Sequence, residues 1–228
     1  MIYLAMILSR NNKHIQFVHI PKCGGTSIYN LLYENGWRIN EEYKKLCEKH
    51  TNFNINIRHL SYAQYKDYYV KFKPALSFVC VRDPLERLRS LCYYVIRQRN
   101  ISGHYSQIKF DTITEFGMMS FLSSVIKDIL IPFGLEYNNN HWLPQSNFIG
   151  EQKLIRLENL EHDLLTMLIK NEIVPSDACV KRLNSTTLKK VDFDFSLSKD
   201  VARFVYYTYG QDFVNLNYTI PHELIRNL

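Results

Sequence analysis

The sequence predicts an α/β protein: a single domain over residues 1–228, with a central parallel sheet flanked by helices. Residues 76–81, LSFVCV, are a nearly continuous apolar run, which is typical of a strand buried on both faces of a parallel sheet. A second β-prone run covers residues 15–20, and each run passes through a short turn into a helical pattern. At 228 residues, 46% of them hydrophobic, the chain is long enough to bury one sizeable core. It contains no repeat, low-complexity tract or linker that would divide this core.

The first strand-to-helix unit is FVHIPKCGGTSI, residues 17–28. Pro21 ends the strand, and the apolar spacing that follows predicts a helix over residues 27–35. Thr26 or Ser27 is expected to cap this helix, because a hydroxyl oxygen accepts a hydrogen bond from the first N–H groups of a helix.

The turn between this strand and this helix has the features of an anion site. Gly24 and Gly25 let the backbone approach a ligand closely, and Lys22 supplies a full positive charge. The helix N-terminus adds N–H groups and the positive end of the helix dipole. A Walker A loop is excluded, because its lysine follows the last glycine whereas Lys22 precedes both. The turn therefore predicts a site for a phosphate-like group; the alternative is a structural glycine turn with an exposed lysine.

The second strand-to-helix unit is VRDPLERLRS, residues 81–90. Asp83 is a good N-cap with Glu86 at the capping-box spacing, and Arg82 falls at the carboxyl end of its strand, where open α/β sheets bind ligands. Arg82 and Ser90 are therefore expected to hold a second anionic end of the same ligand. The alternative is that Arg82 and Arg87 only form local ion pairs with Asp83 or Glu86, which are common and weak.

The remaining elements follow from periodicity and from turn residues. We expect a helix and loop over residues 38–56, an Asn-rich loop over 137–150, a short strand over 154–157, and helices over 114–129, 160–170 and 199–209.

Composition limits the class of protein. Lys+Arg 28 against Asp+Glu 22 gives a net charge of +6, which suits an anionic ligand, a polyanion or a membrane surface, and equally a solvated basic face. The five cysteines are odd in number and form no CxxC pair, so a disulfide framework is not expected. No signal peptide or membrane span is recognised. A cytoplasmic protein is predicted, with a peripheral position at the inner membrane face left open.

The two units together resemble a known family. The segment HIPKCGGTS, residues 19–27, is similar to the 5′-phosphosulfate-binding loop of carbohydrate sulfotransferases, and residues 81–90 are similar to their 3′-phosphate-binding motif. The similarity is to the group that includes heparan sulfate 2-O-sulfotransferase, and it runs from about residue 15 to the C-terminal helix. It implies 3′-phosphoadenosine-5′-phosphosulfate (PAPS) as the donor, adenosine 3′,5′-bisphosphate (PAP) as a product, and a P-loop-kinase-like fold.

The resemblance assigns donor-binding roles position by position. The 5′-phosphosulfate would be held by the loop, and the 3′-phosphate by Arg82 and Ser90. The segment RLNSTT, residues 182–187, is similar to a loop that closes over the same nucleotide in the family. The donor-binding residues implied in this way are Lys22, Cys23, Gly24, Gly25, Thr26, Ser27, Arg82, Ser90, Arg182, Ser185 and Thr186.

The acceptor hydroxyl needs a general base, and histidine is the side chain best matched to neutral pH. His59, in RHLSY, resembles the catalytic histidine segment of the 2-O-sulfotransferase group. His141, in HWLPQ, is similar to a segment bordering the acceptor cleft of related enzymes and is the second candidate, whereas His19 is expected to be structural. Trp142 is expected either to stack on a sugar or to fill the core. Lys22 is expected to stabilise charge on the leaving oxygen.

Other functions remain open at this point. Cys23 at a helix N-terminus is also the expected place for a thiol nucleophile, but the Cys-x5-Arg phosphatase pattern is absent, so we interpret it as a small loop residue. A non-catalytic polyanion- or nucleic-acid-binding protein is a second alternative, and a kinase a weaker third. We expect no metal and no nucleic acid. The expected acceptor is an oligo- or polysaccharide, with a lipid-linked glycan included.

Overall fold

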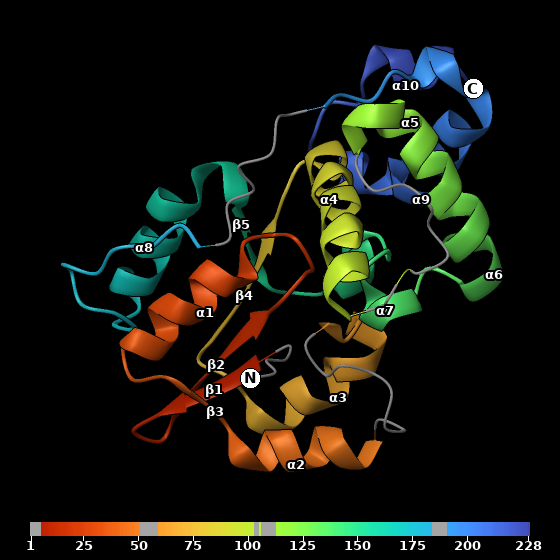
Figure 1. The fold of residues 1–228 in the computed structure, drawn as a ribbon. Coiled ribbons are helices and arrows are strands. Elements are labelled where there is room, and N and C mark those ends of the chain that lie inside the picture. The colour runs from red at the N-terminus through yellow and green to blue at the C-terminus, as the bar shows by residue number, and fades with distance from the viewer. Residues whose placement is uncertain (1–5, 51–58, 103–104, 106–112, 184–190) are drawn as a thin grey trace. The chain divides into compact units, whose positions relative to one another are not determined.

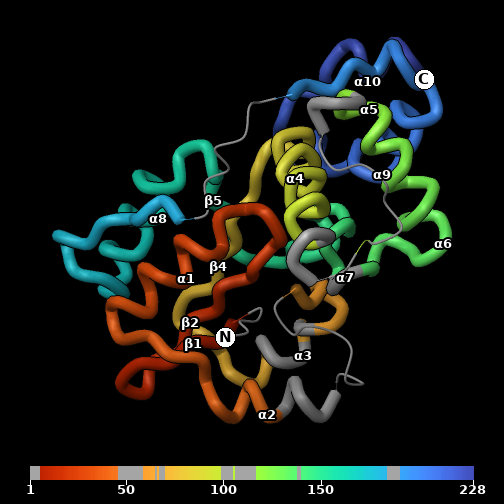
Figure 2. The backbone as a smooth tube through the Cα atoms, in the orientation of Figure 1, coloured from red at the N-terminus to blue at the C-terminus, as the bar shows by residue number. Residues whose placement is uncertain are grey.

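The structure is a computed structural model that describes residues 6–50, 59–102, 105, 113–183 and 191–228 (Figures 1 and 2). The chain forms two compact units, each discontinuous in sequence. Unit 1 contains Met1–Arg82 and Asn147–Ser185, and unit 2 contains Asp83–Ser146 and Thr186–Leu228. The single domain expected over residues 1–228 stays a prediction, and the two units are described separately.

Unit 1 contains a five-stranded sheet in the order β3-β1-β2-β4-β5. Strands β2, β4 and β5 are parallel neighbours, and β1 runs antiparallel to both β2 and β3. The α/β prediction is confirmed, with a mixed, mostly parallel sheet instead of a purely parallel one. The strands are β1 Met6–Arg10, β2 Lys13–Val18, β3 Arg38–Ile39, β4 Leu76–Val81 and β5 Lys153–Arg156.

The antiparallel strand β1 is the part of the sheet that the sequence analysis missed. It forms a hairpin with β2 across Asn11 and Asn12, which both have positive φ angles, 49° and 62°. Two consecutive left-handed residues define the type I′ turn that joins tight hairpins, and asparagine tolerates this conformation. The Asn-Asn pair between two apolar stretches was therefore a readable hairpin signal.

The central strands carry the core of unit 1. Strand β4 has the predicted bounds, and its residues Phe78 to Val81 are buried. Phe17 of β2 is the register partner of Phe78, and their rings stack with centroids 5.2 Å apart. Strand β2 begins two residues earlier than predicted and ends before His19, so the turn that follows β2 lies at the carboxyl edge of the parallel strands.

Helices cover this sheet. In Figure 1, α1 (Gly25–Glu34) lies on one side of the strands, and α2 (Glu41–His50) with α3 (Tyr62–Phe72) on the other. The predicted helix over residues 160–170 is confirmed as α8, Leu160–Lys170. Of the region 38–56, residues 38–50 contain β3 and α2, and residues 51–56 lie outside the described part of the chain.

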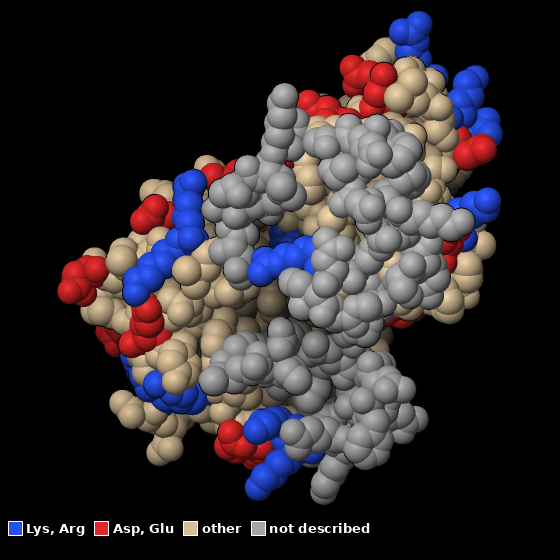
Figure 3. Space-filling model, in the orientation of Figure 1, with Lys and Arg blue, Asp and Glu red and all other residues tan. Residues whose placement is uncertain are grey.

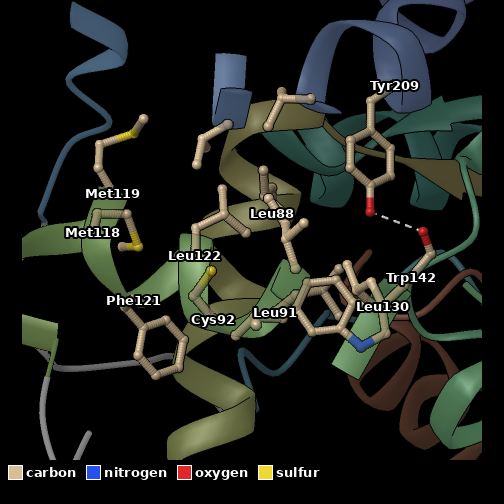
Figure 4. Close-up of a cluster of buried hydrophobic side chains, with 14 of the residues drawn as sticks. Leu88, Leu91, Cys92, Met118, Met119, Phe121, Leu122, Leu130, Trp142 and Tyr209 are labelled. Atoms are coloured by element: carbon tan, nitrogen blue, oxygen red, sulfur yellow. Dashed lines mark hydrogen bonds between the residues drawn. The ribbon is translucent and has the colours of Figure 1, made fainter. Parts of the chain in front are cut away.

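Unit 2 is built from helices around its own core (Figure 4). The cluster includes Leu88, Leu91 and Cys92 of the first long helix, with Phe121 and Leu122 of the next. Its elements are α4 Pro84–Ser102, α5 Ile113–Val125, a π-helical turn Ile126–Leu130, α6 Ile131–Phe133, α7 Tyr137–Asn140, α9 Lys199–Asn215 and α10 His222–Arg226.

Several predicted bounds in this region need correction. The helix expected over residues 114–129 bends at Gly117, which has a φ of 76°, and its last turn is π-helical. The expected loop over 137–150 contains α7 and a 3-10 turn, Gln145–Phe148. The last predicted helix, 199–209, extends to Asn215 and is followed by α10. Tertiary packing extends α9 beyond the point where the hydrophobic pattern weakens.

The N-terminus of α4 confirms the N-cap predicted at Asp83, while the carboxylate of Glu86 bonds Arg89. The Asp83 carboxylate accepts hydrogen bonds from the N–H groups of Leu85 and Glu86, both at 2.9 Å, as an N-cap does. Pro84 occupies the first helical position, where its missing N–H costs nothing.

Candidate functional site

The turn after β2 has a strained backbone at its lysine. The N–H of Cys23 donates to the carbonyl of Ile20 at 3.3 Å, which closes a four-residue turn with Pro21 in its second position. Lys22, in the third position, has a φ of 69°, as a type II turn requires there, although this conformation favours glycine. Left-handed non-glycine residues are costly and concentrate at functional sites.

Helix α1 begins at Gly25 and not at the predicted residue 27. Its N-cap is Gly24, with a φ of 77°, and within the described residues no side chain caps this end. The predicted cap by Thr26 or Ser27 is therefore wrong. The N–H of Ser27 donates back to the carbonyl of Gly24 at 3.0 Å, so the helix N-terminus behind Lys22 can offer a ligand the N–H groups that precede Ser27 and the positive end of the helix dipole.

Gly25 makes room for the ring of His19. A Cβ atom added at Gly25 would lie 1.9 Å from His19 Nε2, which is closer than real atoms approach. At the preceding Gly24 an added Cβ would meet Leu157 Cδ1 at 2.6 Å. Both glycines are therefore required by close packing within unit 1, in addition to any approach of a ligand.

His59 lies beside His19. Its Nδ1 is 3.0 Å from the main-chain oxygen of His19, and the two rings meet edge to face with centroids 4.7 Å apart. A carbonyl oxygen only accepts, so Nδ1 is the protonated nitrogen of His59. The neutral ring therefore carries its lone pair on Nε2, as a general base requires. His59 is buried, with 6% of its surface exposed.

Ser27 holds a distant part of the chain against α1. Its hydroxyl oxygen accepts the N–H of Leu183 at 3.0 Å, and Lys181 Nζ bonds Glu34 Oε1 at 2.6 Å near the other end of the helix. The hydrogen bond from Lys181 lowers the pKa of the Glu34 carboxyl. Arg182, one of the predicted donor-binding residues, lies between these two anchors and is exposed. Its predicted companions Ser185 and Thr186 lie outside the described residues.

Arg82 directly follows β4, the strand next to β2. Val18 and Val79 are register partners in these parallel strands, so the ends that lead to Lys22 and to Arg82 lie at the same edge of the sheet. This is the edge at which the sequence analysis expected both cations. Ser90 lies on α4 in unit 2, next to Arg89, which bonds the carbonyl of Val191 at 2.8 Å.

The thiol of Cys23 is packed inside the loop. Cys23 has 1% of its surface exposed, and its Sγ donates to the carbonyl of Pro21 at 3.8 Å. These contacts support the interpretation of Cys23 as a small loop residue and give no support to a thiol hydrolase.

His141 belongs to unit 2. Its ring stacks flat on Tyr94, with centroids 4.9 Å apart and an interplanar angle of 6°, and the residue is buried. The next residue, Trp142, is fully buried in the core cluster and donates its Nε1–H to Tyr105 Oη at 3.3 Å. Trp142 therefore fills the core, which was one of the two alternatives expected for it.

The main chain around His141 is clamped by three buried side chains that the sequence analysis did not identify as a unit. Arg87 donates to the carbonyls of His141 and Leu143, at 3.0 and 2.9 Å, so the local ion pair considered for Arg87 is not its main contact. Tyr209 donates its hydroxyl to the carbonyl of Trp142 at 2.9 Å, drawn dashed in Figure 4. We call Arg87, Tyr209 and Asp212 the backbone clamp.

Asp212 completes this clamp from α9. Its carboxylate accepts the N–H groups of Gln145 and Ser146, at 2.7 and 2.8 Å. Burial raises the pKa of Asp212, while these two hydrogen bonds act in the opposite direction. Burial also raises the pKa of Tyr209. The sequence indicated a role for Asp212, because this position lies on the apolar face of the helix together with Tyr209 and Leu216, where a carboxylate needs partners.

Charged side chains do not form one continuous basic surface on the face shown in Figure 3. Among the described residues on that face, lysines and arginines occur in separate groups with acidic residues between them. Within unit 1, Lys71 Nζ lies 2.8 Å from Glu42 Oε1. This distribution differs from the single basic stripe that a nucleic-acid-binding surface would present.

Within the described part of the chain, no three or more His, Cys, Asp or Glu side chains are grouped as a metal ion would require. In the same residues, no helix combines the length and the apolar character needed to cross a membrane.

The similarity of this chain to known proteins bears on what the site does. A family model described as "Sulfotransferase family" matches residues 6–219. No curated protein matches the chain. A crystal structure of a sulfotransferase from Alicyclobacillus acidocaldarius is similar over 93% of this chain and 98% of that one, with 13% identity and a TM-score of 0.41.

Proposed function

The chain belongs to the sulfotransferase family, and from that premise we propose that it transfers the sulfuryl group of PAPS to a hydroxyl of a carbohydrate acceptor. One observation carries the proposal. Within unit 1, an uncapped helix N-terminus follows the strained Lys22, and beside it His59 has its Nδ1 proton engaged by a carbonyl. A cationic anion site next to an oriented base is what sulfuryl transfer from an anionic donor to a hydroxyl needs.

The residues present fit the 5′ end of the donor. The loop offers the charge of Lys22 and the first-turn N–H groups of α1, and the packing at Gly24 and Gly25 leaves no room there for a Cβ atom. We assign the 5′-phosphosulfate to Lys22, Cys23, Gly24, Gly25, Thr26 and Ser27. The hydroxyl of Ser27 accepts the Leu183 N–H, and the main-chain N–H of Ser27 donates to the Gly24 carbonyl at 3.0 Å, so we expect the residues before Ser27 to supply the N–H groups that bind the donor.

The 3′-phosphate is assigned to Arg82, with Ser90, Arg182, Ser185 and Thr186 as further donor-binding residues. The position of Arg82 at the same sheet edge as the Lys22 loop supports the first of these assignments. The others rest on the sequence resemblance.

When bound, PAPS supplies an activated sulfuryl group whose leaving group is PAP. His59 Nε2 accepts the proton of the acceptor hydroxyl as its oxygen bonds to sulfur. Lys22 and the first N–H groups of α1 stabilise the negative charge that develops on the phosphate oxygen as its bond to sulfur breaks. The protein thus contributes position, one proton acceptor and preorganised positive charge.

We assign the base role to His59 in preference to His141. The His59 ring is oriented through its Nδ1, which leaves the lone pair on Nε2. The ring face of His141 stacks on Tyr94, and its carbonyl accepts from Arg87, which makes the residue part of the segment held by the backbone clamp.

Calorimetric titration with PAP and with ATP tests the donor assignment. We expect PAP to bind and ATP to bind more weakly, because the proposed site would bind a nucleotide through negative charge at both its 3′ and 5′ positions. Lys22→Ala and Arg82→Ala should each weaken PAP binding, whereas Lys13→Ala, an exposed lysine of β2, should not. A preference for ATP would overturn the donor assignment, and binding of neither would favour a non-catalytic module.

Turnover is tested by following PAP formation from PAPS with a panel of oligosaccharides that differ in their free hydroxyl groups. Lys22→Ala should reduce turnover by about 10²-fold, since loss of one preorganised donor at a developing charge costs about 3 kcal/mol. PAP formation only with non-carbohydrate hydroxyls would overturn the acceptor class while leaving sulfuryl transfer intact.

A further inference from the structure

We propose that His19 is a positioning residue: its side chain is a spacer that sets the distance and tilt of His59 relative to the phosphosulfate loop. This inference rests on the proposed function, in which His59 is the base. Three independent contacts of His19 within unit 1 carry it.

The first contact is through the main chain. The carbonyl of His19 accepts the Nδ1–H of His59 at 3.0 Å and thereby fixes the tautomer of that ring. This bond restrains one point of the ring, and the ring remains free to pivot about it. A second contact is needed to fix the direction in which Nε2 points.

The second contact is between the two rings. The His19 ring meets the His59 ring at 4.7 Å with an interplanar angle of 67°. His19 is in turn stacked on Phe17 at 5.7 Å, and Phe17 on Phe78 at 5.2 Å. The rings of Phe78, Phe17, His19 and His59 therefore contact one another in sequence. Because Phe17 and Phe78 are buried in the parallel strands, the His19 ring that contacts His59 is rigidly supported.

The third contact is with the loop. The His19 ring occupies the space that a Cβ at Gly25 would fill, with Nε2 at 1.9 Å and Cδ2 at 2.1 Å from that position. One ring thus contacts the first residue of α1 and the candidate base. Because packed side chains transmit small displacements, the spacing between the anion site and His59 depends on the size of the residue at position 19.

The test compares His19→Ala with His19→Leu, a variant with a side chain of bulk similar to that of histidine. The matched control is His14→Ala, which removes another histidine of β2, one with its own ring contact to Phe72 and its own bond to Ser9 Oγ. Three measurements are made on each full-length protein: the ring nitrogen tautomer of His59 by ¹⁵N NMR, the Kd for PAP by calorimetry, and kcat with PAPS. The NMR signal of His59 is assigned by its loss in His59→Gln.

In His19→Ala we expect the His59 tautomer to be kept, because the main-chain carbonyl remains, and kcat to fall about 10²-fold, because a misplacement of about 1 Å costs that much. The Kd for PAP should stay within about threefold of the wild-type value, because no contact proposed for the donor is removed. His19→Leu should regain most of the loss, because the role is steric. His14→Ala should keep the tautomer, the Kd and kcat.

Equal losses in kcat and PAP affinity for His19→Ala would mean a structural role in the loop and overturn the proposal. So would a leucine variant no better than alanine, which would make the imidazole itself part of the chemistry. A changed His59 tautomer in His19→Ala would also overturn it, because the loss would then be one of ring protonation and not of position. A wild-type protein that neither binds PAP nor consumes PAPS would contradict the proposed function, whereas an active wild-type protein whose His19 variants fail this pattern would contradict only the role of His19.

Discussion

The two candidate bases, His59 in unit 1 and His141 in unit 2, are both buried, yet they are held in different ways. His59 is held by a ring nitrogen, through its hydrogen bond to the His19 carbonyl. The ring face of His141 stacks on Tyr94, and its carbonyl accepts from Arg87. The nitrogen contact of His59 selects a tautomer, and the stacking contact of His141 fixes the plane of its ring.

The surroundings of the two residues differ in the same sense. In unit 1, a glycine and a main-chain carbonyl bring reactive side chains together. The His19 ring fits against Gly25 and contacts the His59 ring, in the same unit as Lys22. In unit 2, buried polar side chains act on the main chain, since the backbone clamp bonds carbonyl and N–H groups of residues 141–146. Unit 1 thus orients side chains, while unit 2 fixes the path of a segment.

The largest expected effect on activity comes from substituting His59, and it is compared with a substitution of His141. His59→Ala should lower kcat by about 10²–10⁴-fold, the usual contribution of a general base, with the Kd for PAP nearly unchanged. His141→Phe keeps a flat ring on Tyr94 and should retain most of the activity. Steady-state kinetics with PAPS and PAP calorimetry measure both. The reverse ranking would transfer the base role to His141 and break the comparison.

The next effect concerns the stability of unit 2. Asp212→Ala should lower the free energy of unfolding by about 3 kcal/mol, because it removes the acceptor of two buried N–H groups, each of which costs about 1–3 kcal/mol when unsatisfied. Urea denaturation measures this change.

The control for Asp212→Ala is on the same helix. Asp200 is 97% exposed and pairs with Arg203 at 3.8 Å, so Asp200→Ala should change the unfolding free energy by less than about 1 kcal/mol. Equal effects of the two variants would show that the backbone clamp contributes nothing beyond a surface ion pair.

A smaller effect is expected from the glycine that accommodates His19. Gly25→Ala should cost about 1–3 kcal/mol of unfolding free energy, the usual result of overpacking, and should also weaken PAP binding because the start of α1 must shift. Gly210→Ala is the matched control in unit 2. Its added Cβ would meet Tyr206 at 3.7 Å, an ordinary contact, and alanine favours a helix by about 1 kcal/mol. Loss of stability in both variants would contradict the distinction between the two sites.

The sequence was sufficient where a local pattern determines the structure. Strand β4 and helix α8 have their predicted bounds, because an unbroken apolar run and a regular helical spacing define them without help from distant residues. The cap at Asp83 was equally local. The positions of the turns that carry Lys22 and Arg82 were also predictable from local sequence, since each turn follows a strand of the parallel sheet.

The sequence failed where a distant residue changes a local preference. Ser27 was expected to cap α1, but its hydroxyl accepts the N–H of Leu183, which lies 156 positions away in the chain. The partners of Asp212 are 66 and 67 positions away, and the space that His19 takes from Gly25 depends on how a strand meets a helix. The partners in such contacts cannot be predicted from a short segment of sequence, although a carboxylate on an apolar helix face indicates that it has a partner.

The smallest expected effect is a pH dependence of stability that separates Asp212 from exposed carboxylates. Burial, outweighing the N–H groups of Ser146 and Gln145, raises the pKa of Asp212 in the folded protein, while in the unfolded chain it lies near its ordinary value of about 3.9. Between these two values the folded state binds more protons than the unfolded state. The contribution of this group is thus fully present below about pH 3.9 and is lost as the pH rises through the folded pKa.

Asp212→Asn supplies the reference for this measurement, because it has nearly the same shape and does not titrate. The unfolding free energy of the wild type minus that of the variant, from urea denaturation at a series of pH values, should fall as the pH rises above about 3.9. A difference that rises instead would mean that the hydrogen bonds and the nearby Arg87 charge outweigh burial. In that case Asp212 would act in the backbone clamp as an ionised electrostatic partner of the N–H groups and of Arg87.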